Sequence, residues 1–194
     1  MTEPYLHAGT TPLVLQVKKD LERHEGFRVF AYPDPLSKLG KKYKHLPWGF
    51  QPARELLSLI TDMDERDGLP WTVGFGFTDK VTPDSKIERI PAERKLETKI
   101  LEMNTVLGAK LPWYKDASFV TKTILINMAF NMGLFGLLKF RNTLRFIQAK
   151  DYARAASNMK LSLWYRQVGD RAKELVARMA TQTIPAEHKA PERL

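Results

Sequence analysis

The chain has 194 residues, of which 43% are hydrophobic and 27% are charged, and it contains no cysteine. This composition fits one globular domain with a real core and excludes a disordered chain, a disulfide-stapled fold and thiol redox chemistry. The formal net charge of +9 favours polyanionic partners, such as nucleic acid, anionic membrane surfaces or acidic cell-wall polymers. Neither an export signal nor an apolar run of membrane-spanning length is expected from the pattern.

The first predicted element is a helix over residues 12–24. Apolar residues recur there at helical spacing, and the run ends at Glu25 and Gly26, where glycine suits the left-handed position that follows a helix. Glu25 is therefore expected at a helix C-terminus.

Two strands are predicted next, over residues 27–32 and 71–77. The first is rich in aromatic and β-branched residues and ends at Pro33-Asp34-Pro35, which is typical of a turn. The second alternates large apolar and small residues, as a strand does when one face is packed and the other stays open. Together they predict a small sheet.

Residues 38–67 lie between the strands and read as an inserted element, with a basic run and then a helix carrying Leu56, Leu57, Leu59, Ile60 and Met63. From Pro91 onward the pattern is helical, with predicted helices over 91–108, 117–131, 138–149, 152–160 and 172–181. The tail after Pro185 is polar and is expected to be loose.

Several kinds of site have no support in the sequence. The four histidines, His7, His24, His45 and His188, show no metal-ligand spacing, and the glycines around Phe75 lack the pattern of a dinucleotide fingerprint. We therefore expect no metal and no cofactor.

A possible catalytic constellation remains in Glu25, Asp34 and Thr72. Cleavage of a glycosidic bond requires one protonated carboxyl for the leaving oxygen and one ionised carboxyl for water or the transition state. Ionisation should be disfavoured for Glu25 at the negative end of a helix dipole, whereas Asp34 in an open turn should stay charged. Taken singly, the three residues would ordinarily be a solvated surface glutamate, a turn former and a strand-packing threonine.

The surrounding motifs carry a resemblance. The segments His24–Arg28, Tyr32–Pro35 and Trp71–Gly76 resemble the Glu, Asp, Thr signature of the phage-type lysozymes. The similarity continues, in order, through segments of that family's helical lobe: Leu125–Gly133, Phe140–Leu144, Ser162–Tyr165 and Asp170–Lys173.

The resemblance implies a role for each matching residue. Glu25 would be the acid, Asp34 the base and Thr72 the group that orients the catalytic water, while Arg171 would brace the acid. Asn131 and Asn158 fall where the family places polar residues that line the saccharide cleft, although glutamine is common at the first position. Helix-surface amides are an equally good interpretation of both.

Two departures from the family pattern stand out. Phe77 replaces a histidine that many members carry, so apolar packing is expected in place of a charged contact. The insertion 38–67 widens the gap between Asp34 and Thr72 far beyond the family's usual few residues. It is expected to form a self-contained excursion that buries its apolar face either on the small lobe or over the cleft mouth.

The fold class implied is α+β and lysozyme-like, with a small sheet-containing N-terminal lobe and a larger all-helical C-terminal lobe joined by a long helix. Within one lysozyme domain, the small lobe would cover residues 12–90, the connecting helix 91–108, the helical lobe 109–184 and the tail 185–194. The active cleft would lie between the lobes.

The function implied is that of an endolysin. It would hydrolyse the N-acetylmuramic acid to N-acetylglucosamine bond of peptidoglycan with inversion, as a monomer without cofactors. Transient contacts with anionic membranes or wall polymers fit the charge. The enzyme would stay in the host cytoplasm until a holin breaches the membrane, and a virion-associated role is also compatible.

Two alternatives stay open. A lytic transglycosylase would cleave the same bond by intramolecular ring closure, which leaves a water-activating pair without a purpose. A basic helical nucleic-acid-binding protein is suggested by the net charge and by a helix-turn-helix-like stretch over 152–179. Its motifs are less specific, so nucleic acid is not the expected partner.

Overall fold

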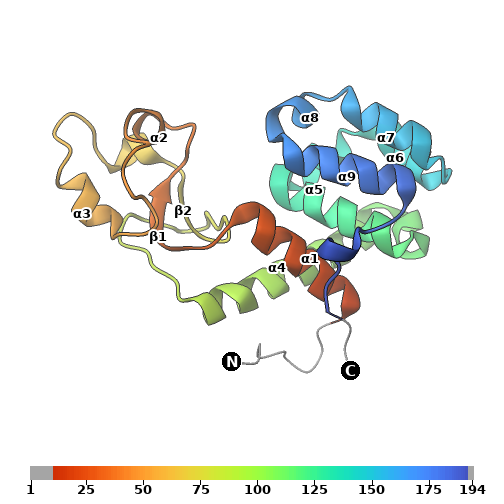
Figure 1. Ribbon diagram of the computed structural model, residues 1–194. Helices are drawn as coiled ribbons and strands as arrows, with labels where there is room; N and C mark the ends of the chain where they lie inside the picture. Colours follow the sequence, from red (N-terminus) through yellow and green to blue (C-terminus); the bar gives the residue numbers. More distant parts are fainter. Residues whose placement is uncertain (1–10, 192–194) are drawn as a thin grey trace. The chain divides into compact units, whose positions relative to one another are not determined.

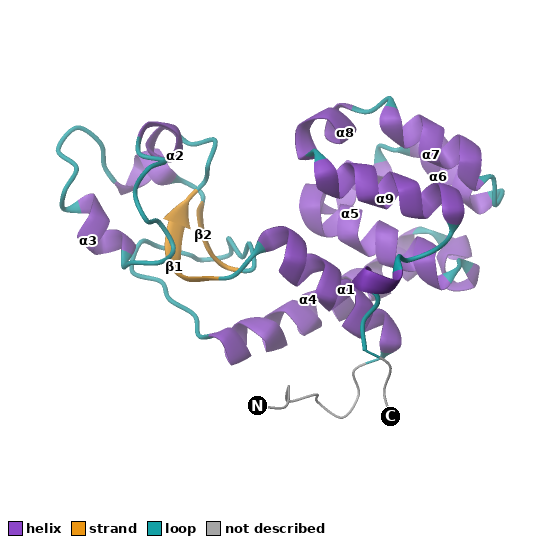
Figure 2. Ribbon diagram, viewed as in Figure 1, coloured by secondary structure: helices purple, strands orange, loops and turns teal. Residues whose placement is uncertain are grey.

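The computed structural model describes residues 11–191, and these form a mostly helical protein with one small antiparallel sheet (Figure 2). This composition of elements agrees with the α+β class expected from the sequence. The chain divides into two compact units, which we call the sheet unit (residues 21–96) and the helical unit (residues up to 20 and from 97 onward). Each unit is described by itself.

The first helix, α1 (Pro12–Glu25), confirms the predicted helix and its end. Gly26 follows with a φ of +65°, and its N–H donates to the Glu22 carbonyl at 3.2 Å. A left-handed residue directly after the last turn is how glycine commonly ends a helix. Glu25 is thereby fixed as the last residue of α1.

The sheet pairs β1 (Arg28–Pro33) with β2 (Trp71–Gly74) in antiparallel register, which confirms the predicted sheet. The second strand is shorter than the predicted 71–77. Gly74 and Gly76 have φ values of +67° and +84°, and Val73 and Phe77 exchange two 2.9 Å backbone hydrogen bonds across them. Residues 74–76 therefore form a tight turn, because left-handed glycines bend the chain where the alternation alone suggested a strand.

The inserted residues contain α2 (Lys38–Lys42), α3 (Ala53–Leu57) and the short 3₁₀ helix η1 (Glu65–Gly68). The helix expected to run from Leu56 to Met63 is wrong in length, because α3 ends at Leu57. Leu59 then points to solvent with 72% of its surface exposed, whereas Ile60 turns inward.

The insertion and the strands share one hydrophobic core. Leu39 and Ala53 are fully buried and pack in one cluster with Ala31 of β1 and Trp71 of β2. Trp48 sets the edge of its ring against Trp71 at a centroid distance of 5.9 Å. Of the two placements expected for the apolar face of the insertion, the sheet unit itself is the surface that receives it.

The helical unit contains the start of α1 and a series of helices from α4 onward (Figure 1). These are α4 (Arg89–Lys110), whose first residues belong to the sheet unit, η2 (Pro112–Asp116), α5 (Phe119–Leu138), α6 (Arg141–Gln148), α7 (Tyr152–Lys160), α8 (Leu163–Val168), α9 (Asp170–Thr181) and η3 (Ala186–His188). Helix α9 contacts α5, α7 and α8, and α6 packs against α7. The short helix α8 was not predicted.

The central helix α5 departs from its predicted end. Gly133 has a φ of +77°, so the helix kinks there and continues to Leu138 instead of ending at residue 131. By length and composition α5 could cross a membrane, but half of its apolar window is buried inside the protein. The side chains from Ile124 to Ala129 are all buried, which identifies α5 as a core helix of this unit.

A buried ion pair joins α1 to α9 in the helical unit. The guanidinium of Arg178 donates to both carboxylate oxygens of Asp20 at 2.7 and 3.0 Å, and each side chain is only 1% exposed. Glu174 also contacts Arg178, at 2.6 Å. The two carboxylates thus compensate a guanidinium that would otherwise be costly to bury.

Residues 186–191 are held in place, although the polar composition predicted a loose tail, and the last three residues of that tail lie outside the described range. The Gln16 side chain donates to the His188 carbonyl and accepts from the Ala190 N–H, both at 2.8 Å. The His188 ring lies 3.4 Å from Glu174. The Lys19 ammonium also donates to the Glu187 carbonyl at 3.2 Å and to the Lys189 carbonyl. Two side chains of α1 therefore hold the backbone of this tail, through interactions between residues too distant in sequence to predict.

Candidate functional site

The sheet unit brings Glu25, Asp34 and Thr72 to one short sheet. At one end of the ladder Arg28 pairs with Gly74, and at the other Pro33 pairs with Trp71. Glu25 precedes the first end and Asp34 follows the second. Thr72 lies between them on β2, so the register sets the order of the three predicted catalytic residues along the sheet.

The carboxyl of Glu25 lies against the turn at residues 74–76. A Cβ built on Gly76 would be 3.3 Å from Glu25 Oε2, closer than most side-chain contacts allow. Gly76 also has a φ of +84°, which L side chains rarely adopt. Glycine at this position therefore leaves room for the half-buried acid and lets the turn approach it.

Aromatic rings support this turn. Phe27, two residues after Glu25, contacts Phe75 at a centroid distance of 5.2 Å, and Phe75 meets Phe77 edge to face at 6.5 Å. Phe75 and Phe77 are each 1% exposed. The apolar packing expected at Phe77 is thus confirmed, and it forms a rigid base for the glycines beside the acid.

Asp34 is held in a turn by the residues that flank the insertion. Its N–H donates to the Gly68 carbonyl at 3.1 Å, and its carbonyl accepts from both the N–H and the hydroxyl of Ser37, at 2.9 and 2.6 Å. The same Ser37 caps α2 by accepting from the Gly40 N–H at 2.9 Å. The two residues that flank the insertion therefore fix the backbone that carries the predicted base, and Ser37 links that backbone to α2.

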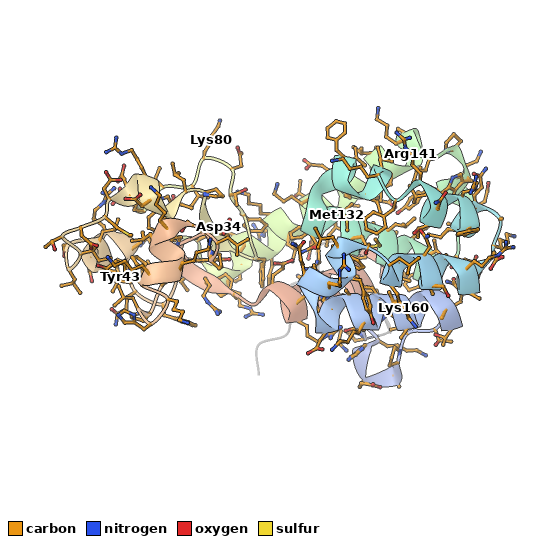
Figure 3. The ribbon with its side chains drawn as sticks, turned by 90° about the horizontal axis from the view of Figure 1, so that it is seen from above. Asp34, Tyr43, Lys80, Met132, Arg141 and Lys160 are labelled. Carbon is orange, nitrogen blue, oxygen red and sulfur yellow. The ribbon has the colours of Figure 1, made fainter. Side chains whose placement is uncertain are left out.

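Only one oxygen of the Asp34 carboxylate has a partner within residues 11–191. Oδ1 accepts the Leu36 N–H at 2.6 Å, which is an Asx-turn bond that orients the side chain. Oδ2 is left available to accept a proton. Figure 3 labels Asp34 and Tyr43, which lie apart from each other in the sheet unit.

Tyr32 is a site residue that the sequence interpretation missed. It is the direct cross-strand partner of Thr72, and it precedes Asp34 by two residues on β1. Burial raises the pKa of its phenol, the negative charges of Glu25 and Asp34 raise that pKa further, and the positive charge of Arg28 lowers it. Both carboxylates thus act on one phenol, whose place opposite Thr72 depends on the strand register.

The remaining predicted residues belong to the helical unit. Arg171, at the start of α9, donates to the side chain and the backbone carbonyl of Asn127, at 2.8 and 3.1 Å. Asn127 is fully buried in α5, so these bonds anchor the guanidinium to the core of the unit.

The two predicted cleft asparagines are also engaged in this unit. Asn131 accepts from the indole N–H of Trp164 at 2.9 Å, and Asn158 accepts from the Thr143 hydroxyl at 2.8 Å. Each amide therefore keeps its NH₂ group for another partner. This agrees with either a saccharide contact or an ordinary helix-surface role.

Metal binding was also considered. Over the described range 11–191, no three His, Asp or Glu side chains gather closely enough to hold a metal ion. The titratable groups described above are therefore those available for chemistry in the sheet unit.

Comparison with known proteins finds a family match for the chain. A family model described as "Phage lysozyme" matches residues 56–182. A probable T4-type lysozyme 1 of Dictyostelium discoideum is 32% identical over 138 residues, which are 66% of this chain and 79% of that protein. A second probable T4-type lysozyme of the same organism is 32% identical over 37% of this chain and 42% of its own length.

A phage structural protein is also similar. The pre-baseplate central spike protein of Enterobacteria phage T4 is 27% identical over 176 residues, which are 89% of this chain but only 29% of that protein. Because the match covers so much of this chain, it includes residues 25–72. The similarity to the spike protein therefore extends over the part of the chain that holds Glu25, Asp34 and Thr72.

Proposed function

Because the chain belongs to the phage lysozyme family of glycoside hydrolases, we propose that it hydrolyses the β-1,4 bond between N-acetylmuramic acid and N-acetylglucosamine in bacterial peptidoglycan. The observation that carries this proposal is the order of groups on the sheet. The Glu25 carboxyl, beside the glycine turn, and the Asp34 carboxyl, in its hydrogen-bonded turn, lie at opposite ends of the sheet. The Thr72 hydroxyl lies between them on β2.

The proposed reaction is a single displacement with inversion. Glu25 gives its proton to the glycosidic oxygen as the bond from that oxygen to the anomeric carbon breaks. A water molecule, whose proton passes to Asp34, forms the new bond to that carbon from the opposite face. Thr72 orients the water by hydrogen bonding, and both carboxyls return to their starting states by proton exchange with solvent.

The helical-unit residues have supporting roles in this proposal. Arg171 braces the acid, and Asn131 and Asn158 bind the saccharide. Support for the first role is that Arg171 is already anchored on the buried Asn127 and so presents a fixed charge. Support for the second is that each asparagine has a free NH₂ donor, which suits sugar hydroxyls and acetamido carbonyls.

The variant Glu25→Gln tests the assignment of the acid. It removes the transferable proton while keeping the shape, so hydrolysis should fall by on the order of a hundredfold or more with folding intact. Glu55→Gln is the matched control, because Glu55 is an exposed carboxyl of the same unit, on α3. Substantial turnover by folded Glu25→Gln protein would refute the role of Glu25.

Analysis of the products by mass and by anomeric configuration tests the reaction type. Hydrolysis should give muropeptides with free reducing ends, formed first as the α anomer. Products lighter by one water would instead identify a lytic transglycosylase. A protein that leaves peptidoglycan intact but binds DNA with steep salt dependence would be a nucleic-acid-binding protein.

The biological role that we propose is lysis of the host bacterium by a monomeric enzyme that reaches the wall from the cytoplasm. Expression in a bacterium should cause lysis when a holin is co-expressed and not in its absence. If the protein instead sediments with phage particles, a virion-associated role, as the similarity to a spike protein would suggest, replaces this one.

A further inference from the structure

Tyr32 occupies the one position of β1 that faces both Thr72 and Asp34. It is paired with Thr72 across the strands, and residues directly opposite in an antiparallel pair project from the same face. Asp34 follows two residues later, which returns to that face when the chain stays extended. The phenol also feels the charges of Glu25 and Asp34, so it lies within range of both carboxyls.

The hydroxyl of Tyr32 is unused inside the protein. Within residues 11–191 it makes no hydrogen bond, and it is not among the buried polar atoms left without a partner, so solvent reaches it. Other tyrosines differ: Tyr43 donates to Asp62, and Tyr114 donates to Asn104 at 2.8 Å. A half-buried phenol whose hydroxyl is free, beside two carboxyls, is positioned to contact a molecule that enters the site.

The electrostatic environment keeps this hydroxyl protonated. Burial and the two carboxylates raise the pKa of the phenol above its usual value, so it stays a hydrogen-bond donor throughout the neutral range. Donors are scarce among the other two groups. The Asp34 carboxylate can only accept a hydrogen bond, and Thr72 has a single hydroxyl proton.

We propose that Tyr32 is a further catalytic residue, whose hydroxyl donates a hydrogen bond to the water that Asp34 activates. The water then has four defined neighbours: it donates to Asp34 and to the Thr72 hydroxyl, it accepts from Tyr32, and its remaining lone pair attacks the anomeric carbon. Tyr32 keeps its proton throughout the reaction. The inference rests on the proposed hydrolase function.

The substitution Tyr32→Phe tests this role because it removes the hydroxyl and keeps the ring. We expect kcat on soluble peptidoglycan fragments to fall on the order of 10- to 100-fold, because a misplaced nucleophile reacts slowly, while KM changes by less than about twofold. The control is Tyr43→Phe, which removes a phenol hydroxyl of the same unit at the C-terminus of α2. This control should keep the wild-type kcat.

The outcomes separate this inference from the proposed function. An active wild-type enzyme whose Tyr32→Phe variant keeps its kcat, or changes only in KM, overturns the role of Tyr32 and leaves the hydrolase intact. A wild-type protein that releases no reducing ends refutes the proposed function itself.

A second variant covers the case in which Tyr32→Phe does not fold. Site-specific incorporation of 3,5-difluorotyrosine at position 32 keeps the hydroxyl but lets it ionise near neutral pH. The ratio of the variant kcat to the wild-type kcat at the same pH should then fall as the pH rises, in step with the phenolate absorbance. A constant ratio through the ionisation of this phenol overturns the proposal.

Discussion

Replacing Gly40 by alanine should displace Asp34 although the two residues lie on different elements. A Cβ at position 40 would lie 2.1 Å from the Asp34 carbonyl oxygen and 2.9 Å from its carbonyl carbon. Real Cβ atoms essentially never come closer than 3.0 Å to another heavy atom, so the backbone must move by about 0.9 Å. No flexible side chain can absorb this shift, because the neighbouring atoms are backbone.

The cost follows from the bonds that meet at this oxygen. The N–H and the hydroxyl of Ser37 both donate to it, and each hydrogen bond contributes about 0.5–1.5 kcal/mol. Losing both should lower the free energy of unfolding by about 1–3 kcal/mol. Because a displacement of roughly 1 Å can cost about a hundredfold in rate, kcat should fall by a similar factor.

Urea unfolding and release of reducing ends from peptidoglycan measure the two effects of Gly40→Ala. The control is Gly108→Ala in α4, where a Cβ meets only Tyr114 at 4.0 Å. That change should raise stability by about 0.5–1 kcal/mol, as alanine does in helices, and leave activity unchanged. Wild-type activity and stability in Gly40→Ala would refute the reasoning that the insertion fixes Asp34.

Three further predictions follow from the same structure. Gly76→Ala should lower the rate of hydrolysis by a larger factor than it lowers the equilibrium constant for folding, since the new methyl crowds the Glu25 carboxyl. Equal factors, by turnover assay and urea unfolding, would contradict this. Arg178→Met should lower the free energy of unfolding by about 3–5 kcal/mol by removing the guanidinium that compensates the buried Asp20 carboxylate, and a loss below about 1 kcal/mol would show the pair to be dispensable. Burial raises the pKa of Tyr114, so the contribution of this residue to stability is complete below the unfolded-state pKa and is lost as the pH rises above it. Tyr114→Phe should therefore make the alkaline loss of stability less steep in urea unfolding between about pH 9 and 11. An unchanged slope would argue against this role of Tyr114.

The elements with clear local signals could be predicted from the sequence. Helix α7 begins and ends at the predicted residues, and the Asp151 side chain accepts from the Arg154 N–H to cap it. Helix α1 likewise ends where Gly26 predicts. By contrast, α8 has only six residues, capped by Ser162, and is too short to give a helical period.

The candidate site was predictable only in part. Glu25, Asp34 and Thr72 could be named because acid, base and hydroxyl chemistry restricts the residue types and because the surrounding motifs resemble a family. Tyr32 and Gly40 could not, because the role of each depends on a contact between elements. Thr72 lies opposite Tyr32 only through the strand register, and Gly40 touches Asp34 only because α2 folds back on the turn.

The length of the insertion does not by itself disturb the predicted base. In a sheet, the separation of two residues depends on the register of the strands and not on the number of residues that connect them. Pro33 pairs with Trp71 and Tyr32 with Thr72, so Asp34, directly after β1, stays near Thr72 on β2 although residues 38–67 lie between them in the chain. Ser37 and Gly68, which flank the insertion, supply the hydrogen bonds that hold the Asp34 backbone. An added segment that replaces a short turn can therefore keep an aspartate in place, provided that it shares its core with the same two strands, as Leu39 and Ala53 do.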